Sequence, residues 1–501
     1  MSANNNLPSG LPDAGGFIPK SKLIEPIEQI NNQLNPLTNS SVAVPSDSLG
    51  SLQAGTMTQT VLKLAWPVII QNLLMTMTMY VDTIMLGQVG ETAVAAMGVN
   101  RPLLMAVRIV LMSISVGTLA IVARAYGGND PARVARQAAA SLIVAVIIGI
   151  SVSLTGFFLA EPLIGIYVNQ ADYPELYYHA VMYYRITISA FFSSYIFLVG
   201  STIFRACGNT TTPMLIAIYV NIFNVFGNYC LIYGNLGCPA LGVEGAALSS
   251  ALADIIEGVL FCFIVFSKRS CVPLKLRHFF EVKWSSLKTL FRVSLPAVVE
   301  PLVIQAGMLV LYKIITSLGP TAIASHQIVL SIESLSFMPG MGLSIACGAL
   351  VGQYLGAKRV DLAETAYRTS LRLSLIVMTT MGVIFALFPG YLVRLFIDPK
   401  NSPDVVTLAA TCLMIGAIEE PFIALAMAHQ GTLRGAGDTK SSAWVAFIGV
   451  WLVRLPLVYL FVKVLGWGLV GVWAMMPVDW MVRAVAFRIM YLKGRWKTIH
   501  L

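Results

Sequence analysis

Three polar side chains in two apolar segments of the amino-terminal half could bind a cation. Asp82 lies in segment 61–87, and Asn224 and Asn228 lie in segment 212–233. The asparagines are four residues apart, so they share one face of a helix. A carboxylate with two amide carbonyls offers the oxygen ligands that suit a small cation. The carboxylate could instead carry a proton, because burial disfavours its ionised form. A structural interpretation also stands, in which Asp82 bonds to the asparagines only to join two helices.

The carboxy-terminal half has its own acidic set. Glu300, Glu333, Glu419 and Glu420 each lie near the middle of an apolar segment. A charge at the bilayer centre costs about 2.5–3.5 kcal/mol, so these carboxylates should be protonated, cation-bound or open to water. An acidic cavity would attract organic cations, and the sequence therefore predicts a substrate or cation site at these glutamates. For Glu300 and Glu420, each followed by a proline, the alternative is that the carboxylate only satisfies a broken helix.

Five further charged residues in apolar segments have less distinct roles. Asp479 and Arg483 are four residues apart and are expected to neutralise each other. Arg454 precedes a Leu-Pro pair and is expected to bind backbone or a carboxylate. Arg108 and Asp254 lie in mid-segment and could pair with each other, but no motif assigns them a role.

Cysteine and histidine spacing predicts neither a metal site nor an enzyme. The chain has seven cysteines and five histidines, with no CxxC pair and no His-rich cluster. Such clusters are what a metal site or a redox centre requires. We therefore expect no cofactor and no catalytic centre. Cys230 and Cys238 bracket a short loop and could form a disulfide in an oxidising compartment.

The elements that position these residues are predicted to be membrane-spanning helices. The chain of 501 residues is 57% hydrophobic and 11% charged, whereas soluble domains have about 25% charged residues. About 20 apolar residues are enough for a helix to cross a bilayer. The sequence predicts twelve such segments, at 61–87, 93–122, 137–160, 176–204, 212–233, 241–267, 289–317, 322–351, 368–390, 405–432, 440–464 and 467–492.

An internal repeat divides these segments into two halves. At least twelve residue pairs are identical at a constant offset of 229, among them Pro67 with Pro296, Gly127 with Gly356 and Arg205 with Arg434. Each half has an even number of crossings, so the halves are related by an axis along the membrane normal. The predicted fold is an all-α polytopic membrane protein in which twelve helices form two six-helix bundles as a parallel repeat.

Charge placement predicts the topology. We expect a disordered cytoplasmic tail at 1–55, an N-terminal lobe at 56–267, a cytoplasmic linker at 268–288, a C-terminal lobe at 289–492 and a tail at 493–501. Lys and Arg concentrate in the loops on the side of the amino terminus, which the positive-inside rule places in the cytoplasm with the carboxy terminus. The net charge of +9 flanks the spans instead of forming one patch, so we expect no nucleic-acid partner.

The repeated Arg-x-x-Gly-Asn/Asp-Thr runs, at 205–210 and 434–439, are predicted to be short turns. Glycine supplies the turn, and the arginine is expected at the phosphate interface. We interpret these matched positions as scaffold. The function should then depend on the positions at which the halves differ, such as Asp82, which aligns with Leu311, and Glu300, which aligns with Gln71.

Several runs of residues together resemble the multidrug and toxic compound extrusion (MATE) family over about 61–498. They are Tyr80-Val81-Asp82-Thr83-Ile84-Met85-Leu86-Gly87, the run from Arg205 to Pro213, Leu433 to Lys440, Val351-Gly352-Gln353, Arg454-Leu455-Pro456 and Gly494-Arg495-Trp496-Lys497. No single string is decisive, whereas their order across two six-helix halves is specific to the family.

The resemblance implies two lobes in a V that alternate between inward and outward openings, exporting organic, often cationic, compounds in exchange for Na⁺ or H⁺. It implies that Asp82 is the cation-coupling aspartate of the first helix, and that Asn224 and Asn228 are the polar pair of the fifth. Some relatives carry an aspartate where this chain has Asn228. The carboxy-terminal glutamates depart by about one turn from the family's positions, with Ile304 and Ile423 where acids are expected.

The leading prediction is thus a cation-coupled antiporter in the plasma (inner) membrane that acts as a monomer on small organic substrates among membrane lipids. A flippase for lipid-linked precursors, from the same superfamily, is the alternative, and it would favour a cationic cavity. A membrane-embedded enzyme would need a reactive constellation that the five histidines do not supply.

Overall fold

The computed structural model describes residues 54–267, 270–272, 274–499 and 501. The predicted amino-terminal tail therefore lies outside the described residues, except for its last two positions, which begin the first helix. Within the described part, the chain is helical and contains no strand. This confirms the predicted all-α fold class.

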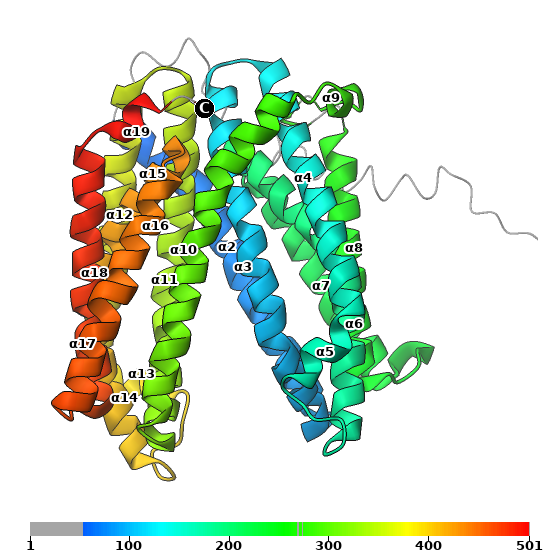
Figure 1. Cartoon of the computed structure of the whole chain (residues 1–501), viewed down its shortest axis with the longest axis vertical. Helices are drawn as coiled ribbons and strands as arrows, with labels where there is room; N and C mark the ends of the chain where they lie inside the picture. The colour runs from blue at the N-terminus through cyan, green and yellow to red at the C-terminus, as the bar shows by residue number, and fades with distance from the viewer. Residues whose placement is uncertain (1–53, 268–269, 273, 500) are drawn as a thin grey trace, which may run out of the picture. The chain divides into compact units, whose positions relative to one another are not determined.

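Six long helices form the first half (Figure 1). They are α2 (Ala54–Gly87), α3 (Glu91–Gly127), α4 (Pro131–Phe158), α6 (Pro174–Ala206), α7 (Thr211–Tyr233) and α8 (Gly242–Val265). The short helix α5 (Ala160–Gly165) joins α4 to α6, and α9 (Arg277–Phe280) lies in the linker. We call the end of the molecule at which α2 begins the near end and the opposite end the far end; in Figure 1 the near end is at the top.

The second half repeats this order with two interrupted spans. It contains α10 (Trp284–Thr316), α11 (Pro320–Gly356), α12 (Val360–Leu387), α13 (Pro389–Arg394), α14 (Pro403–Gly416), α15 (Glu420–Ala436), α16 (Thr439–Phe447), α17 (Leu455–Tyr459) and α18 (Gly468–Leu492). Helix α19 (Arg495–Thr498) follows, and α10 begins inside the segment predicted as linker.

Both interruptions lie within membrane-spanning segments. Helices α14 and α15 are bent by 51° at a short break, and two π-helical segments, η2 (Ile448–Arg454) and η3 (Leu460–Val464), flank α17. Eleven described helices are long and apolar enough to cross a membrane, and the bent pair makes a twelfth span. The predicted twelve crossings are confirmed.

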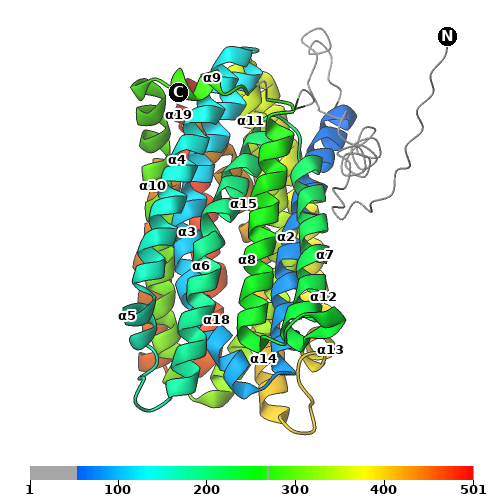
Figure 2. The same ribbon diagram turned by 90° about the vertical axis from the view of Figure 1, so that its right-hand side faces the viewer.

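The first helix of each half packs against the other half at the near end. Met57, Val61, Leu64 and Ala65 of α2 lie in a hydrophobic cluster whose other buried members come from α11, α12 and later helices. Leu290 of α10 lies in the cluster built mainly from α3, α4, α6 and α8. Figures 1 and 2 show α2 and α10 each running beside helices of the other half. The two bundles therefore exchange their first helices at this end.

Two glycines of the repeat make this crossing possible. Gly127 ends α3 and Gly356 ends α11, and a methyl group on either would collide with the backbone of the opposite helix, at Gln353 and Arg124 respectively. The side chain of Gln353 also crosses between the halves, since its amide donates to the carbonyl of Ala206 at 2.8 Å. Backbone contact this close leaves no room for a side chain.

The carboxy-terminal tail adds a second connection between the halves. Trp496 is fully buried and stacks on Tyr491 at 5.2 Å, which anchors α19 to the second half. From the first half, Arg124 donates to the carbonyl of Ile499, and Arg133 donates to that of Leu501 at 2.5 Å. The near end is thus held together by a helix crossing and by a peptide strap.

Substituting Gly356→Ala should loosen this crossing. The added methyl must displace the backbone at Arg124, and overpacking of this kind costs about 1–3 kcal/mol. We expect a lower thermal unfolding temperature for the purified protein and greater access of a water-soluble thiol reagent to a cysteine placed near Gln353. The matched control is Gly98→Ala in α3, where nothing lies within 4 Å of the new methyl. Equal stability of the two variants would contradict the proposed tight crossing.

Candidate functional site

The structure brings together the three polar residues predicted in the first half. Asp82 comes from α2, and Asn224 and Asn228 come from α7. The Nδ2 of Asn228 donates to Asp82 Oδ1 at 2.6 Å and lies 3.4 Å from Asn224 Oδ1. Asn228 is fully buried, Asn224 is 4% exposed, and Asp82 is half-buried. We refer to these three residues as the aspartate site.

The packing of α8 on α7 turns the two asparagines toward α2. Ser249 donates to the backbone carbonyl of Asn224 at 2.9 Å, and Ser250 accepts from the Asn224 side chain at 3.3 Å. Gly227 permits this approach, because a methyl there would meet Ser249 Oγ at 2.5 Å. One face of α7 is thus fixed to α8, and the face that carries the side chain of Asn228 contacts Asp82.

The aspartate site has oxygen atoms available for a cation. Asn228 Oδ1 is buried and makes no hydrogen bond, although buried amide oxygens usually have a partner. The amide nitrogen of the same side chain contacts Asp82 and Asn224, and the carboxylate and amide oxygens of these three residues are hard ligands of the kind that suit a small cation. The same set could hold a proton on Asp82, with Asn228 as its hydrogen-bond partner. The residue types therefore fit both coupling ions that the sequence left open.

A second set of interacting polar side chains lies in the first half, on α3, α6 and α8. Arg108 of α3 sits over the ring of Phe191 at 5.7 Å and interacts electrostatically with Asp254 and Glu257 of α8. Asp254 also forms a hydrogen bond with Ser194. No sequence motif assigned a role to Arg108 and Asp254, and Glu257 was not predicted to belong to this group. Glu257 could have been predicted to join this group, because an acid three residues after Asp254 lies on the same helical face.

Glu300 has different partners from the other glutamates of the second half. It is 1% exposed, accepts from Gln430 at 2.5 Å and forms an ion pair with Arg434 at 2.9 Å. The repeat-related position in the first half makes the same contact with a neutral residue, since Arg205 donates to Gln71 at 2.6 Å. The two repeated arginines thus anchor the last turns of α6 and α15 to the first helix of each half.

This contact revises the expected place of the two arginines. Arg205 is 9% exposed and Arg434 is half-buried, so neither guanidinium lies on the surface that would contact lipid phosphates. Each guanidinium instead lies inside its own bundle. The sequence could not show this, because each arginine lies 134 positions after its partner residue in the chain.

The remaining three glutamates meet at the broken span. Glu419 and Glu420 lie at the 51° break between α14 and α15, and Glu333 lies on α11. The carboxyl groups of Glu333 and Glu419 lie close enough to interact directly, and two carboxyl groups can form a hydrogen bond only if one of them carries a proton. Ser336 donates to Glu420 at 2.5 Å, while Glu420 Oε1 and Glu419 Oε2 are buried without partners. We refer to these glutamates as the glutamate site.

A cluster of three charged side chains lies next to the glutamate site. Asp479 accepts from Arg454 at 2.6 Å and from Arg483 at 2.8 Å, and all three side chains are buried. This agrees with the predicted Asp479–Arg483 couple and gives Arg454 a carboxylate partner. Two cations on one anion leave a positive charge in excess, and Arg454 interacts electrostatically with Glu333 and Glu419.

The cysteines show no disulfide. All seven lie within the described residues, and each is a free thiol. Cys230 and Cys238 are close enough for their thiols to interact. No group of three or more His, Cys, Asp or Glu side chains in the described part of the chain is arranged to hold a metal ion.

Replacing Glu300 by glutamine tests whether it is an anchor or a coupling carboxylate. Glu300→Gln gives the second half the neutral acceptor that Gln71 supplies in the first, so we expect a folded protein with transport within about twofold of wild type. Glu300→Leu leaves Arg434 without its acceptor and should lower stability by about 1–3 kcal/mol. Thermal unfolding and transport assays measure both. Complete loss of transport in Glu300→Gln would contradict the anchoring role.

Comparison with known proteins agrees with this architecture. A family model, MatE, matches residues 67–230 and 296–460, one copy in each half and together more than half of the chain. A probable multidrug resistance protein NorM from Thermotoga maritima is 31% identical over 437 residues, covering 87% of this chain and 92% of that protein. The uncharacterized transporter YisQ of Bacillus subtilis is 28% identical, covering 86% of this chain and 93% of that protein.

Solved structures show the same fold at lower identity. A MOP superfamily transporter from Pyrococcus furiosus superposes with a TM-score of 0.81 at 23% identity, covering 89% of this chain and 97% of that one. The outward-facing conformation of a multidrug resistance MATE family transporter superposes with a TM-score of 0.80, with the same identity and coverage. With its two matched repeats and twelve spans, this integral membrane protein belongs to the MATE family of transporters.

Proposed function

We propose that this protein is a cation-coupled antiporter that exports organic, cationic or amphipathic compounds by alternating access. The observation that carries the proposal is the aspartate site, where a carboxylate and two amides meet with one buried oxygen left unbonded. Such a group is costly within a membrane unless it binds something. The multidrug resistance described for the relatives from Thermotoga and other bacteria supports the same activity.

The proposed cycle uses the aspartate site as the point of ion exchange. When Asp82 is ionised it attracts Na⁺ or H⁺ from the outside, and the bound cation neutralises a charge that would otherwise be stranded at membrane depth. Neutralisation changes the balance between the two openings of the lobes, because a ligand shifts a conformational equilibrium by its differential affinity for the two states. Release of the cation inside lets the next substrate bind from the inside, and that substrate leaves on the outside when a new cation binds there.

The glutamate site is the proposed place for a cationic substrate or a second cation. Glu333, Glu419 and Glu420 include two buried carboxyl oxygens without partners, and a proton shared by the Glu333–Glu419 pair can be exchanged for another positive group. The break between α14 and α15 supports this role, because discontinuous helices in transporters commonly lie at binding sites. Glu300 is assigned to the scaffold instead.

The charge pattern supports a proposal for the orientation of the transporter. We infer that it lies in the plasma (inner) membrane as a monomer, with both termini in the cytoplasm, so that the near end faces inward and the far end outward. The basic loops that support this orientation flank the near ends of the helices.

Asp82→Asn tests the coupling site directly. Asparagine keeps an acceptor for Asn228 and so should preserve the contact between α2 and α7, but it can neither ionise nor take up a proton. We expect gradient-driven efflux of a dye from vesicles to fall to the level of vesicles without protein, with normal membrane insertion. Glu91→Gln, an exposed acid at the far end of α3, serves as the control. Wild-type efflux by Asp82→Asn would reject the proposal, and imposing a pH or a Na⁺ gradient separately identifies the ion.

A flippase for lipid-linked precursors is the second candidate. The related Pyrococcus furiosus transporter is described as having a binding pocket of reverse polarity that suggests a different function, so the fold alone does not select the substrate. A precursor with phosphates would require a cationic cavity, whereas the glutamate site contains three carboxyl groups. Translocation of a lipid-linked precursor in vesicles that show no dye efflux would reverse this ranking.

A further inference from the structure

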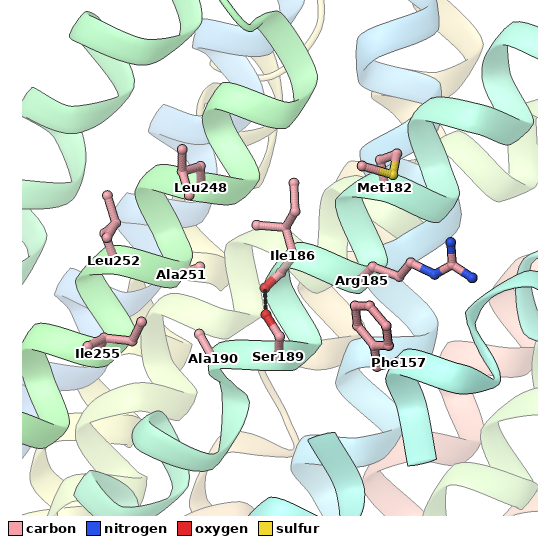
Figure 3. A pocket seen from close by; sticks show the side chains of 10 residues that line it. All are labelled: Phe157, Met182, Arg185, Ile186, Ser189, Ala190, Leu248, Ala251, Leu252 and Ile255. Carbon is pink, nitrogen blue, oxygen red and sulfur yellow. Dashed lines mark hydrogen bonds between the residues drawn. The ribbon is translucent and has the colours of Figure 1, made fainter. Parts of the chain in front are cut away.

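A crevice on the first half is open to the membrane and separate from both sites described above. It lies between α4, α6 and α8 and has a volume of about 460 Å³. Eight of its lining residues are apolar; the two polar ones are Arg185 and Ser189. Figure 3 shows the crevice walls, with Leu252 and Ile255 on one side and Phe157 on the other.

The surface around the crevice faces lipid. Along α8, Leu252, Ile255, Val259 and Phe263 are between 39% and 61% exposed. They repeat every three or four residues, which is the spacing of one helix face. On a membrane-spanning helix, an exposed apolar face of this kind contacts acyl chains. The crevice is therefore a recess into which an acyl chain can lie.

Arg185 gives this apolar recess a single cationic group. In Figure 3 its guanidinium extends away from the apolar wall, beside the ring of Phe157, and it lies 5.4 Å from the centre of that ring. Its Nη2 donates to Glu161 at 2.8 Å, while its Nε is buried without a partner. A guanidinium has five donors, so one carboxylate oxygen leaves most of them available to a second anion.

The depth of Arg185 matches the position of a lipid phosphate. Helix α6 has 33 residues, about 50 Å at 1.5 Å per residue, against a hydrocarbon core of about 30 Å. If the excess is shared equally, about 10 Å of the helix lies outside the core at each end. Arg185 is eleven residues after Pro174, about 16 Å along the axis, so its backbone lies a few ångströms inside the core. A flexible arginine side chain can reach back to the interface from there.

The second half has no equivalent group. The position that the repeat relates to Arg185 is Met414, and the position related to Glu161 is Gly390. An arginine that is present in only one half is not among the positions that the two halves share. Its ion pair with Glu161 is partly exposed, with 29% and 58% of the side chains accessible, and such pairs contribute about 0–1 kcal/mol. The pair alone is a weak reason for an arginine at this depth.

We propose that the crevice between α4, α6 and α8 binds an anionic phospholipid, with an acyl chain along Leu248, Leu252 and Ile255 and the phosphate on Arg185. Glu161 competes with the phosphate for the guanidinium and so sets the affinity. The lipid belongs to the leaflet at the far end, which is the outer leaflet in the proposed topology. This assignment is independent of the coupling ion and of the exported substrate.

The test uses full-length protein in nanodiscs with a phosphatidylglycerol that carries a photoreactive group on one acyl chain. Cross-linking is expected at peptides from α4, α6 and α8. Arg185→Gln should reduce it about tenfold, the loss expected for one charge-assisted contact. Arg394→Gln, an exposed arginine of α13 at the far end of the other half, should leave it unchanged. Glu161→Gln should increase it, because the competing carboxylate is removed.

A second variant separates the acyl chain from the phosphate. Ser189→Phe fills the exposed edge of the crevice, and the lost hydroxyl bonds only to the carbonyl of Ile186 in its own helix, so folding should survive. Cross-linking should fall although Arg185 is intact. Wild-type cross-linking in Arg185→Gln would overturn the proposal. The proposal is also overturned if inorganic phosphate displaces the lipid from the wild-type protein and still binds to the Ser189→Phe variant. A third contrary outcome is that a transported dye, and not added phospholipid, protects these peptides from cross-linking.

Discussion

An ionised side chain cannot remain alone in hydrocarbon, and this constraint organises the interior of the protein. Asp479 is held by two arginines, and Glu300 is held by Arg434 and Gln430. These charges are compensated and have no need of a ligand. The aspartate site and the glutamate site differ, because none of their carboxyl groups forms an ion pair with an arginine or lysine in the described part of the chain, whereas Glu300 and Asp479 do. Hydrogen bonding does not separate them, since Glu300 Oε2 is also buried without a donor. The missing counter-charge distinguishes the sites proposed to bind a cation from the charged groups that only hold helices together.

The repeat explains how one framework carries two different sites. Arg205 and Arg434 take equivalent positions and reach equivalent residues of the first helices, but the acceptor is Gln71 in one half and Glu300 in the other. The architecture thus tolerates a neutral or a charged acceptor at the same place. Selection could alter the polar residues of each half separately while the helix contacts remained the same.

Much of the fold and the aspartate site could be predicted from the sequence. Apolar length gives the crossings, and the spacing of Asn224 and Asn228 places both on one face of α7, where Asp82 reaches Asn228. The grouping of the glutamates could not be predicted, because it depends on which helices become neighbours. Glu300 and Glu333 lie in adjacent spans of the second half, yet Glu300 turns to Arg434 and Glu333 turns to Glu419. Glu257 was missed although its spacing from Asp254 is informative.

The exchange of first helices has a consequence for how the chain is made. Met57, Val61 and Leu64 of α2 find their neighbours in α11 and α12, nearly 300 residues later. While the ribosome is still synthesising the second half, this apolar surface must be covered by lipid or by the insertion machinery. This part of the α2 surface is therefore buried by protein only after α11 and α12 have been made. Biogenesis is completed only when the last helices arrive, and a truncated product would expose its first helix to quality control.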